Sequence, residues 1–343
     1  MMATMRDLTS MHSTRSLAAG RPLIVLAAGT FSEAHLEQAR VGRRATVEVA
    51  DLGSRDKVRE TTELAAGVIV TNNPFPRELV DALGPRVRIL TRAGIGLDAI
   101  DLASVAHRGI TVINLPGYAT DEVATHAVAL MLAVARRLKE SDEAARSHWS
   151  QWRGMGGMRA IEESVVGIVG CGRIGAAVIR RMAPFTRSIF AYDAFATKIP
   201  RPARLVGSLE ELLGLADIVS LHLPLTPATS GLLGAQELAL MRPGAILVNV
   251  ARGSLVDQGA LAAALASGHL GGAALDVLVE EPPQLSDAIL QAPNTLITPH
   301  VGWYSTRSER RVREQAIDDT LNFLSGRQLR YASLVTGPHT NEV

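Results

Sequence analysis

Residues 165–182 read VVGIVGCGRIGAAVIRRM, and this stretch decides the fold. A short β-branched run enters a glycine-rich turn and leaves it as a helical segment, which is how a dinucleotide-binding βαβ unit begins. In such a turn Gly170 permits a tight bend, Gly172 lets the backbone approach a pyrophosphate, and Gly175 lets the helix pack closely on the strand. Free amides at the start of the helix favour the phosphates. Because the unit begins near mid-chain, the residues before it need their own explanation.

An acidic residue downstream supports this interpretation of the turn. The run SIFAYD ends at Asp193, about 18 residues after the last glycine, where a carboxylate accepts hydrogen bonds from both hydroxyls of the adenine ribose. A carboxylate there would repel a 2′-phosphate, so NAD is favoured over NADP as the cofactor. The structural alternatives are a glycine turn that serves only packing and a solvated strand end at Asp193.

Strand-like runs recur on both sides of the turn, with segments between them that can be helical. On the C-terminal side the runs are VVGIVG, SIFAYD, DIVSLHLP, AILVNV, GAALDV and TLITPH. Six strands of this spacing predict one doubly wound parallel sheet. On the N-terminal side RPLIVLAAG, GVIVTN, VRILTRAG and ITVINLP predict a second parallel α/β region. A helix over 305–326, with Gly326 at its end, follows the last strand.

Two further segments stand out between these regions. From Asp121, DEVATHAVALMLAVARRL offers a capping Thr or Asp and then apolar residues on nearly every face. Such a helix must be covered on all sides, so we expect its own sheet and a second subunit to bury it in a homodimer. The following SHWSQWRGMGGM is expected to be a loop.

Composition excludes several classes of protein. The 343 residues are 47% hydrophobic and 20% charged with a formal net charge of +1, which gives no basic field for nucleic acid or an anionic membrane. The single Cys171 excludes internal disulfides, and no His pair has metal-ligand spacing, so a reducing cytoplasm fits and no metal is expected. Residues 1–20 have no apolar core of a secretory signal and are expected to form a mobile tail.

Reactive side chains follow the last three predicted strands. Arg252 comes just after AILVNV, Asp276 and Glu281 after the next strand, and His300 after the last. Ligands bind at the carboxyl edge of a parallel sheet. There an arginine could grip a carboxylate, a histidine could give a proton and a glutamate could orient and charge that histidine, which together would reduce a 2-keto acid. Taken singly, an arginine or a glutamate is more often part of a surface salt bridge, and a lone histidine is more often structural.

The segments GIVGCGRIG, SLHLPLTPATSGLL, NVARGSLVD, ALDVLVEEPP and TPHVGWYS resemble the signatures of the D-isomer-specific 2-hydroxyacid dehydrogenases, phosphoglycerate dehydrogenase-like branch, over residues 21 to 330. The resemblance implies an α/β fold of two Rossmann-like domains, with a doubly wound NAD domain inserted into a flavodoxin-like substrate domain. We therefore expect a substrate domain from 21–117 and 313–343, and an NAD domain over 118–312. This explains the mid-chain position of the glycine turn.

The resemblance also implies roles for residues of this chain. Arg252 would bind the substrate, His300 would be the acid/base group and Glu281 its partner. The loop RAGIGLDAID, with Gly94, would hold the substrate carboxylate on the amides of Ile95 and Gly96. Expected NAD contacts, besides the three glycines, are Arg173, Ile174, Asp193, Leu223, Val250, Ala251 and Asp276.

Departures from the family pattern leave the substrate open. Trp303 and Tyr304 stand where many members have small residues, and this WYS pattern is similar to the C-terminal-binding-protein branch, some of whose members are NAD-sensing corepressors. Trp303 would reach the substrate's side-chain pocket, or pack the interdomain hinge. Ile95 stands where phosphoglycerate dehydrogenases often have a polar residue, so phosphoglycerate is disfavoured. The alternatives are an NAD-sensing binding protein and a dehydrogenase of an oxyanion such as phosphite.

Overall fold

The computed structural model describes residues 20–29, 34–147, 149, 157–158 and 160–336. Most of the expected N-terminal tail and of the loop SHWSQWRGMGGM lies outside these residues. The chain divides into two compact units: unit 1 comprises Met1–Leu115 and Arg313–Val343, and unit 2 comprises Pro116–Val312. Unit 2 is thus inserted between the two segments of unit 1. The sequence predicts domain boundaries at 117/118 and 312/313, and the two units divide at 115/116 and 312/313.

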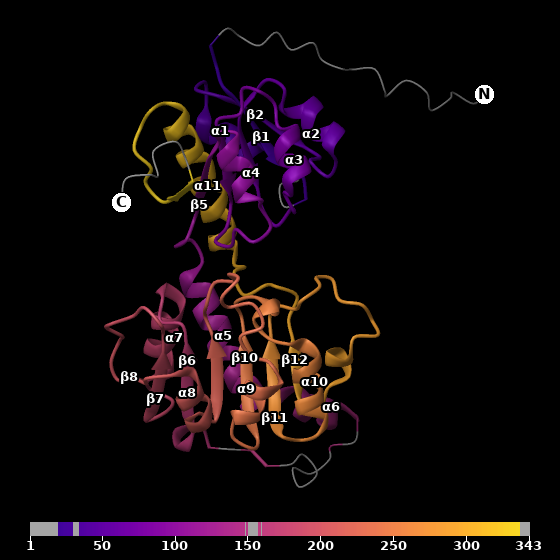
Figure 1. The fold of residues 1–343 in the computed structure, drawn as a ribbon, viewed down its shortest axis with the longest axis vertical. Helices are drawn as coiled ribbons and strands as arrows, with labels where there is room; N and C mark the ends of the chain where they lie inside the picture. Colours follow the sequence, from indigo (N-terminus) through magenta and orange to yellow (C-terminus); the bar gives the residue numbers. More distant parts are fainter. Residues whose placement is uncertain (1–19, 30–33, 148, 150–156, 159, 337–343) are drawn as a thin grey trace, which may run out of the picture. The chain divides into compact units, whose positions relative to one another are not determined.

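Unit 1 is an α/β domain built on a six-stranded sheet (Figure 1). Its strands are β1 (Leu23–Ala27), β2 (Thr46–Ala50), β3 (Ala65–Val70), β4 (Ile89–Arg92), β5 (Thr111–Asn114) and β13 (Ser333–Thr336). They lie in the order β13-β5-β4-β3-β1-β2, parallel except for the antiparallel β13. The parallel strands therefore have the 2-1-3-4-5 order of the flavodoxin-like fold, as expected.

The helices of unit 1 are α1 (His35–Val41), α2 (Arg55–Thr62), α3 (Arg77–Ala82), α4 (Leu102–His107) and the C-terminal part of α11 (Thr306–Leu324). Two contacts tie α11 to the N-terminal segment. The hydroxyls of Thr91 and Thr320 are 2.6 Å apart in the buried interior, and Arg313 donates to the buried carboxylate of Glu37 at 2.6 Å. The last helix is therefore part of the core of unit 1.

Two strands of unit 1 were not expected from the sequence. In β2 only the second of the five residues is buried, and β13 has no buried residue. Both lie at the edges of the sheet. Edge strands need no continuous apolar run, because only part of their surface is covered, so neither gave a strand signal. In contrast β1, LIVLA, is buried along its whole length.

Unit 2 contains a seven-stranded sheet in the order β12-β11-β10-β9-β6-β7-β8, with every pair parallel. The strands are β6 (Val165–Val169), β7 (Ser188–Tyr192), β8 (Arg204–Leu205), β9 (Ile218–Leu221), β10 (Ala245–Asn249), β11 (Leu270–Leu275) and β12 (Thr295–Ile297). The six expected strands are present, and the short β8 adds to them. The order reverses at β6, so the crevice expected for a ligand lies beyond the carboxyl ends of β6 and β9.

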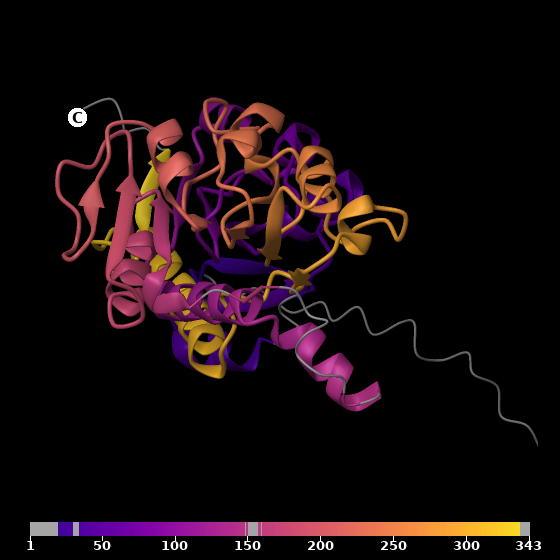
Figure 2. The same ribbon diagram turned by 90° about the horizontal axis from the view of Figure 1, so that it is seen from below.

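Helices cover the sheet of unit 2. One apolar cluster joins α8 (Leu209–Leu215), α9 (Ala235–Leu240) and α10 (Gln258–Ala266) to β9, β10 and β11. The helix α5 (Thr120–Ala135) packs on α7 (Arg173–Met182), β10 and β11. Figure 2 shows α6 (Leu138–Ser147) continuing beyond the end of α5, away from the sheet, and none of its residues is buried.

The structure corrects the physical argument made for α5. Eight of its residues are already buried within one chain: Val123, Ala124, Ala127, Val128, Leu130, Met131, Val134 and Ala135. Its N-cap residue, Ala119, makes no side-chain capping bond, so the expected Thr or Asp cap is wrong. Half of the 16 helix residues are therefore covered without a second subunit, so the apolar sequence of the helix does not by itself require one. A homodimer stays a prediction, which light scattering would check.

Among the described residues, no helix combines the length and the apolar character needed to cross a membrane.

Candidate active site

The glycine turn after β6 has the geometry that the sequence predicts. Gly170 has a φ of +92°, and a Cβ there would lie 2.7 Å from the carbonyl oxygen of His222. A Cβ on Gly175 would lie 1.9 Å from the carbonyl oxygen of Gly170, so only glycine lets α7 approach the strand end this closely. At Gly172, the N-cap of α7, nothing lies within 4 Å of the Cβ position. The turn is therefore tight at both ends and open at the point where a phosphate would approach.

The first residues of α7 lie beside this open point. Arg173 is exposed and Ile174 is partly buried. A helix N-terminus presents unpaired amides and the positive end of the helix dipole. Both residues are thus placed where a bound pyrophosphate would meet them.

Asp193 lies at the end of β7, next to the glycine turn. Its carboxylate accepts hydrogen bonds from the amides of Cys171 at 2.7 Å, and of Phe195 and Ala196 at 2.9 Å. Burial by itself would raise the pKa of the Asp193 carboxyl, but these three amides bring it below its ordinary value. The carboxylate is therefore ionised at neutral pH. Burial and the nearby Asp193 charge raise the pKa of the Cys171 thiol to about 11, which argues against a redox role for it.

Leu223 follows β9, on the far side of the glycine turn. Its side chain packs against the position that a Cβ of Gly170 would take, at 2.9 Å. The preceding His222 contacts Ser220 through Nε2 at 2.9 Å, and burial lowers its pKa to about 3. His222 is therefore neutral. Nothing in the spacing of His222 distinguishes it from a core residue, so the sequence alone does not indicate its place beside the glycine turn.

Arg252 is positioned by a local network after β10. The side chain of Asn249 accepts from the amide of Ala251 at 3.0 Å and donates to the carbonyl of Arg252 at 2.8 Å. Val250 is buried, and the Arg252 guanidinium donates to the carbonyl of Ala251 at 2.6 Å. A Cβ on Gly253 would lie 2.0 Å from the carbonyl carbon of Leu278. This glycine lets the Arg252 loop approach the segment that carries Glu281.

Glu281 and His300 form the exposed pair of the site. Nδ1 of His300 lies 2.7 Å from Oε2 of Glu281, and Oε1 of Glu281 accepts from the amide of Leu278 at 3.1 Å. Burial would raise the pKa of Glu281, but His300, the Leu278 amide and the charge of Arg252 lower it below its ordinary value. Arg252, Glu281 and His300 are thus brought together, as the sequence predicts.

Asp276 anchors the loop that carries His300. Its buried carboxylate accepts from the hydroxyl of Thr298 at 2.6 Å and from the amides of Val301 and Gly302 at 2.9 and 2.8 Å. His300 adopts a positive φ of +53°, an uncommon conformation for a non-glycine residue. The Asp276 carboxylate, expected from the sequence only as an NAD contact, therefore holds the backbone around His300.

His126, on α5, completes this network and was missed by the sequence analysis. Its Nε2 lies 3.0 Å from the Thr298 hydroxyl and 3.3 Å from Oδ1 of Asp276. We call Asp276 and His126 the buried pair. The only available signal was a lone histidine within an apolar helix, and such a residue is usually structural. Recognising the contact requires the packing of α5 on β11 and β12.

Trp303 packs in a row of three aromatic rings. Its ring centroid is 6.2 Å from that of Tyr118 and 5.6 Å from that of Tyr304, the latter in an edge-on arrangement. Tyr118 is buried and lies three residues beyond Leu115, where the chain crosses from unit 1 into unit 2. This contact agrees with the packing role considered for Trp303.

The expected carboxylate loop follows β4 in unit 1. The buried Arg92 donates to the carbonyls of Ala93 and Gly96 and to the side chain of Asn72, and Asn114 donates to the carbonyl of Ile95 at 2.8 Å. A Cβ on Gly94 would lie 2.4 Å from the Arg92 guanidinium. The carbonyls of this loop are therefore occupied. Within the described residues, the amides of Ile95 and Gly96 have no acceptor.

Known proteins resemble this chain in sequence and in fold. Residues 128–302 match the model of a family described as D-isomer specific 2-hydroxyacid dehydrogenase, NAD binding domain. The chain is 36% identical to glyoxylate reductase of Thermococcus litoralis over 281 residues, which are 79% of this chain and 83% of that protein. The crystal structure of D-lactate dehydrogenase from Aquifex aeolicus, complexed with NAD and lactic acid, superposes with a TM-score of 0.78 at 26% identity, covering 89% of this chain and 96% of that one.

A longer relative matches as well. The chain is 35% identical to D-3-phosphoglycerate dehydrogenase of Mycobacterium tuberculosis (strain ATCC 25618 / H37Rv) over 308 residues, which are 89% of this chain. The match covers 58% of that protein. The chain thus spans little more than half the length of this relative.

Proposed function

Because the chain belongs to the D-isomer specific 2-hydroxyacid dehydrogenase family, we propose that it is an enzyme that interconverts a D-2-hydroxy acid and the 2-keto acid with NAD. The observation that carries the proposal is the 2.7 Å contact between His300 Nδ1 and Glu281 Oε2, made within reach of the Arg252 charge. An acid/base group, its orienting carboxylate and a carboxylate-binding cation are what this reaction requires.

His300 moves the proton in this proposal. With Nδ1–H donated to Glu281, the ring presents Nε2 to the substrate oxygen. In the reducing direction the imidazolium gives its proton to the carbonyl oxygen as that oxygen gains negative charge, and in the oxidising direction the neutral ring takes the hydroxyl proton. Glu281 stays ionised, because its pKa lies below its ordinary value, and it stabilises the charged ring.

Arg252 and the loop after β4 bind the substrate carboxylate. The guanidinium is a planar fork that can hold a carboxylate in two hydrogen bonds. The amides of Ile95 and Gly96 supply further donors, and the contacts of Arg92 and Asn114 with the loop carbonyls keep the loop backbone in place.

The residues around the glycine turn fit NAD. The open position at Gly172 and the start of α7 accommodate a pyrophosphate, and the ionised Asp193 disfavours a 2′-phosphate. Leu223, Val250, Ala251 and Asp276 follow the neighbouring strands β9, β10 and β11, as an extended dinucleotide site requires. The bound nicotinamide supplies the hydride acceptor or donor. Asp276 acts in addition as a positioning residue for the His300 loop.

For the substrate we propose a small or medium apolar 2-keto acid. The relatives are named for 3-phosphoglycerate, glyoxylate and D-lactate, so family membership alone does not select among them. The Ile95 side chain offers no polar group to a phosphate, and the Trp303 indole presents mostly apolar surface and no cation. Both observations disfavour a phosphorylated side chain.

The test is a panel of 2-keto acids with NADH, followed by loss of NADH absorbance and repeated with NADPH. We expect turnover of glyoxylate, pyruvate or a longer apolar acid with NADH, and Asp193→Ala should lower the preference for NADH over NADPH. Binding of NADH without turnover of any acid would refute the proposed activity in favour of an NAD-sensing protein. Reduction of NAD by phosphite instead would identify an oxyanion dehydrogenase.

A further inference from the structure

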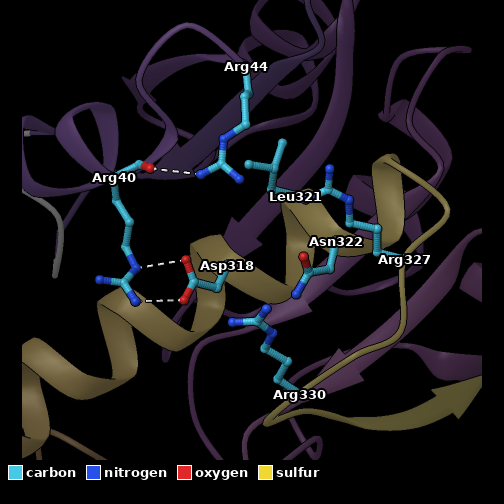
Figure 3. Close-up of a pocket in the computed structure, with 7 residues that line it drawn as sticks. All are labelled: Arg40, Arg44, Asp318, Leu321, Asn322, Arg327 and Arg330. Atoms are coloured by element: carbon cyan, nitrogen blue, oxygen red, sulfur yellow. Dashed lines mark hydrogen bonds and ion pairs between the residues drawn. The ribbon is translucent and has the colours of Figure 1, made fainter.

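Unit 1 contains a cavity of about 330 Å³ near the C-terminal ends of α1 and α11 (Figure 3). Four of its lining residues are arginines, and the others include one carboxylate, one amide and one apolar side chain: Arg40, Arg44, Asp318, Leu321, Asn322, Arg327 and Arg330. All of them belong to unit 1, whereas the proposed proton-transfer pair belongs to unit 2.

One of the four arginines is neutralised within the protein. Arg40 donates twice to the carboxylate of Asp318, at 2.7 Å each, and lies 3.6 Å from Glu314. This bidentate pair fixes α1 against α11. Because Asp318 is engaged by Arg40, it is not available to balance the remaining arginines.

Among the described residues, the guanidinium groups of the other three arginines make no ion pair with a carboxylate. Arg44 donates to the carbonyls of Val41 and Arg40, which are neutral acceptors. Within the described residues, the guanidinium groups of Arg327 and Arg330 have no acceptor. Figure 3 shows the dashed contacts of Arg40 and Arg44 and none at Arg327 or Arg330, with the Arg330 side chain extending toward Asn322.

The backbone that carries Arg330 is held by a buried carboxylate. Asp319 is fully buried and accepts from the amides of Arg330, Tyr331 and Ala332 at 2.7 to 2.8 Å. Arg327 follows Gly326, whose φ of +66° ends the helix, and its own amide donates to the carbonyl of Asn322 at 2.8 Å. The arginines are therefore presented from a fixed turn, although holding like charges together is unfavourable.

We propose that this cavity binds a small organic phosphate that carries two or more negative charges. A guanidinium matches a phosphate in two parallel hydrogen bonds, and three of them compensate a doubly or triply charged group. The volume lies in the range of small-molecule sites, which begins at about 300 Å³. Leu321 and Asn322 provide an apolar contact and an amide for the rest of the molecule. The site is separate from the proposed hydride-transfer site and does not depend on it.

The test is a calorimetric titration of the full chain with inorganic pyrophosphate, after saturation with NADH so that the glycine turn is occupied. We expect one saturable site per chain. In the double variant Arg327→Ala/Arg330→Ala the Kd should rise about 100-fold, at about tenfold for each lost charge-assisted contact. Both side chains are exposed, so the Tm should be unchanged.

The matched control is Arg55→Ala/Arg59→Ala, which removes the same charge from two exposed positions on α2 of the same unit. Its Kd should equal that of the parent chain. An equal loss in both double variants would overturn the site in favour of diffuse charge attraction, and the absence of saturable binding would overturn it outright. Citrate, titrated in parallel, should bind more weakly than pyrophosphate. Tighter binding of citrate would overturn the assignment to phosphates.

Discussion

The exposed pair, Glu281 and His300, and the buried pair, Asp276 and His126, each join a carboxylate to a histidine, but the two carboxylates differ strongly in exposure. The side chains of Glu281 and His300 are 39% and 31% accessible to solvent, whereas Asp276 is 3% accessible and His126 is 23% accessible. The two pairs are linked through one loop, because the backbone amide of His300 donates to the carbonyl of Asp276 at 2.8 Å.

The difference between the pairs lies in what else the carboxylate binds. Glu281 accepts one amide besides its histidine, and in our proposal its histidine exchanges a proton with the substrate. Asp276 accepts a hydroxyl and two amides in addition to its histidine contact. The Asp276 carboxylate therefore mainly holds the loop that carries His300 in place. A carboxylate–histidine contact is thus not by itself a sign of proton transfer. The exposure of the pair and the other hydrogen bonds of its carboxylate must also be considered.

The largest expected contrast is between the two histidines. In our proposal His300→Gln should lower kcat by about 10² to 10⁴, the usual contribution of a general acid, while NADH still binds. His126→Gln is the matched control and should lower kcat by about fivefold or less, because in our proposal His126 supports the loop and transfers no proton. Steady-state kinetics with a fluorescence titration of NADH checks both. Equal losses in the two variants would refute the division into a proton-transfer pair and a structural pair.

The next effect concerns the cation beside the exposed pair. Arg252→Lys keeps the charge but loses the planar fork, so the KM for the keto acid should rise about 30-fold, for one charge-assisted hydrogen bond of about 2 kcal/mol. The Kd of NADH should change little. If substrate and NADH weakened equally, Arg252 would belong to the cofactor site.

For protein stability we expect the reverse: a substitution in the buried pair should cost more than one in the exposed pair. Asp276→Asn places an amide against several donors, and we expect the free energy of unfolding to fall by about 2 kcal/mol, whereas Glu281→Gln should change it little. Folding lowers the pKa of Asp276. Its stabilisation is therefore present above the unfolded pKa and is lost as the pH falls through the folded pKa. Urea unfolding at neutral and acidic pH should show the Asp276→Asn deficit shrinking in acid; a deficit constant with pH would contradict this.

A smaller effect is expected in the pH profile of the exposed pair. The lowered pKa of Glu281 keeps the carboxylate charged at neutral and mildly acidic pH, where it stabilises the imidazolium needed to reduce a keto acid. Glu281→Gln should therefore move the alkaline fall of the reduction rate to lower pH. Rates measured across neutral pH give the shift, and an unchanged profile would remove Glu281 from the mechanism.

The smallest expected effect separates the two roles of Trp303. If the indole contacts substrate, Trp303→Phe should lower kcat/KM for apolar keto acids about fivefold, for a contact of about 1 kcal/mol, and leave glyoxylate unaffected. If it only packs against Tyr118 and Tyr304, all substrates should change alike. The ratio of kcat/KM between glyoxylate and a longer apolar acid distinguishes the two.

Most of the nucleotide-binding half could be predicted because its signals are local. A few neighbouring residues are enough to predict the turn at residues 170–175 and the strands β6, β9 and β10. The family resemblance of the motifs is confirmed, and with it the two-domain fold. The contact between Glu281 and His300 was expected because both follow strands of one sheet.

The features that escaped prediction depend on packing between distant segments. His126 and Asp276 are 150 residues apart in the sequence, and their side chains approach to 3.3 Å. Nothing in the sequence around either residue predicts this contact. The edge strands β2 and β13 lack apolar runs. The apolar sequence of α5 predicts burial but does not say whether the same chain or a second subunit provides it. The arginine cavity joins α1 to residues almost 300 positions later, so composition alone could not find it.

The crossing of α11 into unit 1 has a consequence for synthesis on the ribosome. Glu37 and Thr91 emerge early, but their partners Arg313 and Thr320 follow only after all of Pro116–Val312. At about 5 to 20 residues per second, this interval lasts about 10 to 40 s. During it the N-terminal strands lack both their covering helix and the edge strand β13. Unit 2, a continuous segment, can complete its sheet first, so the half of unit 1 that is made first is the last to close its core.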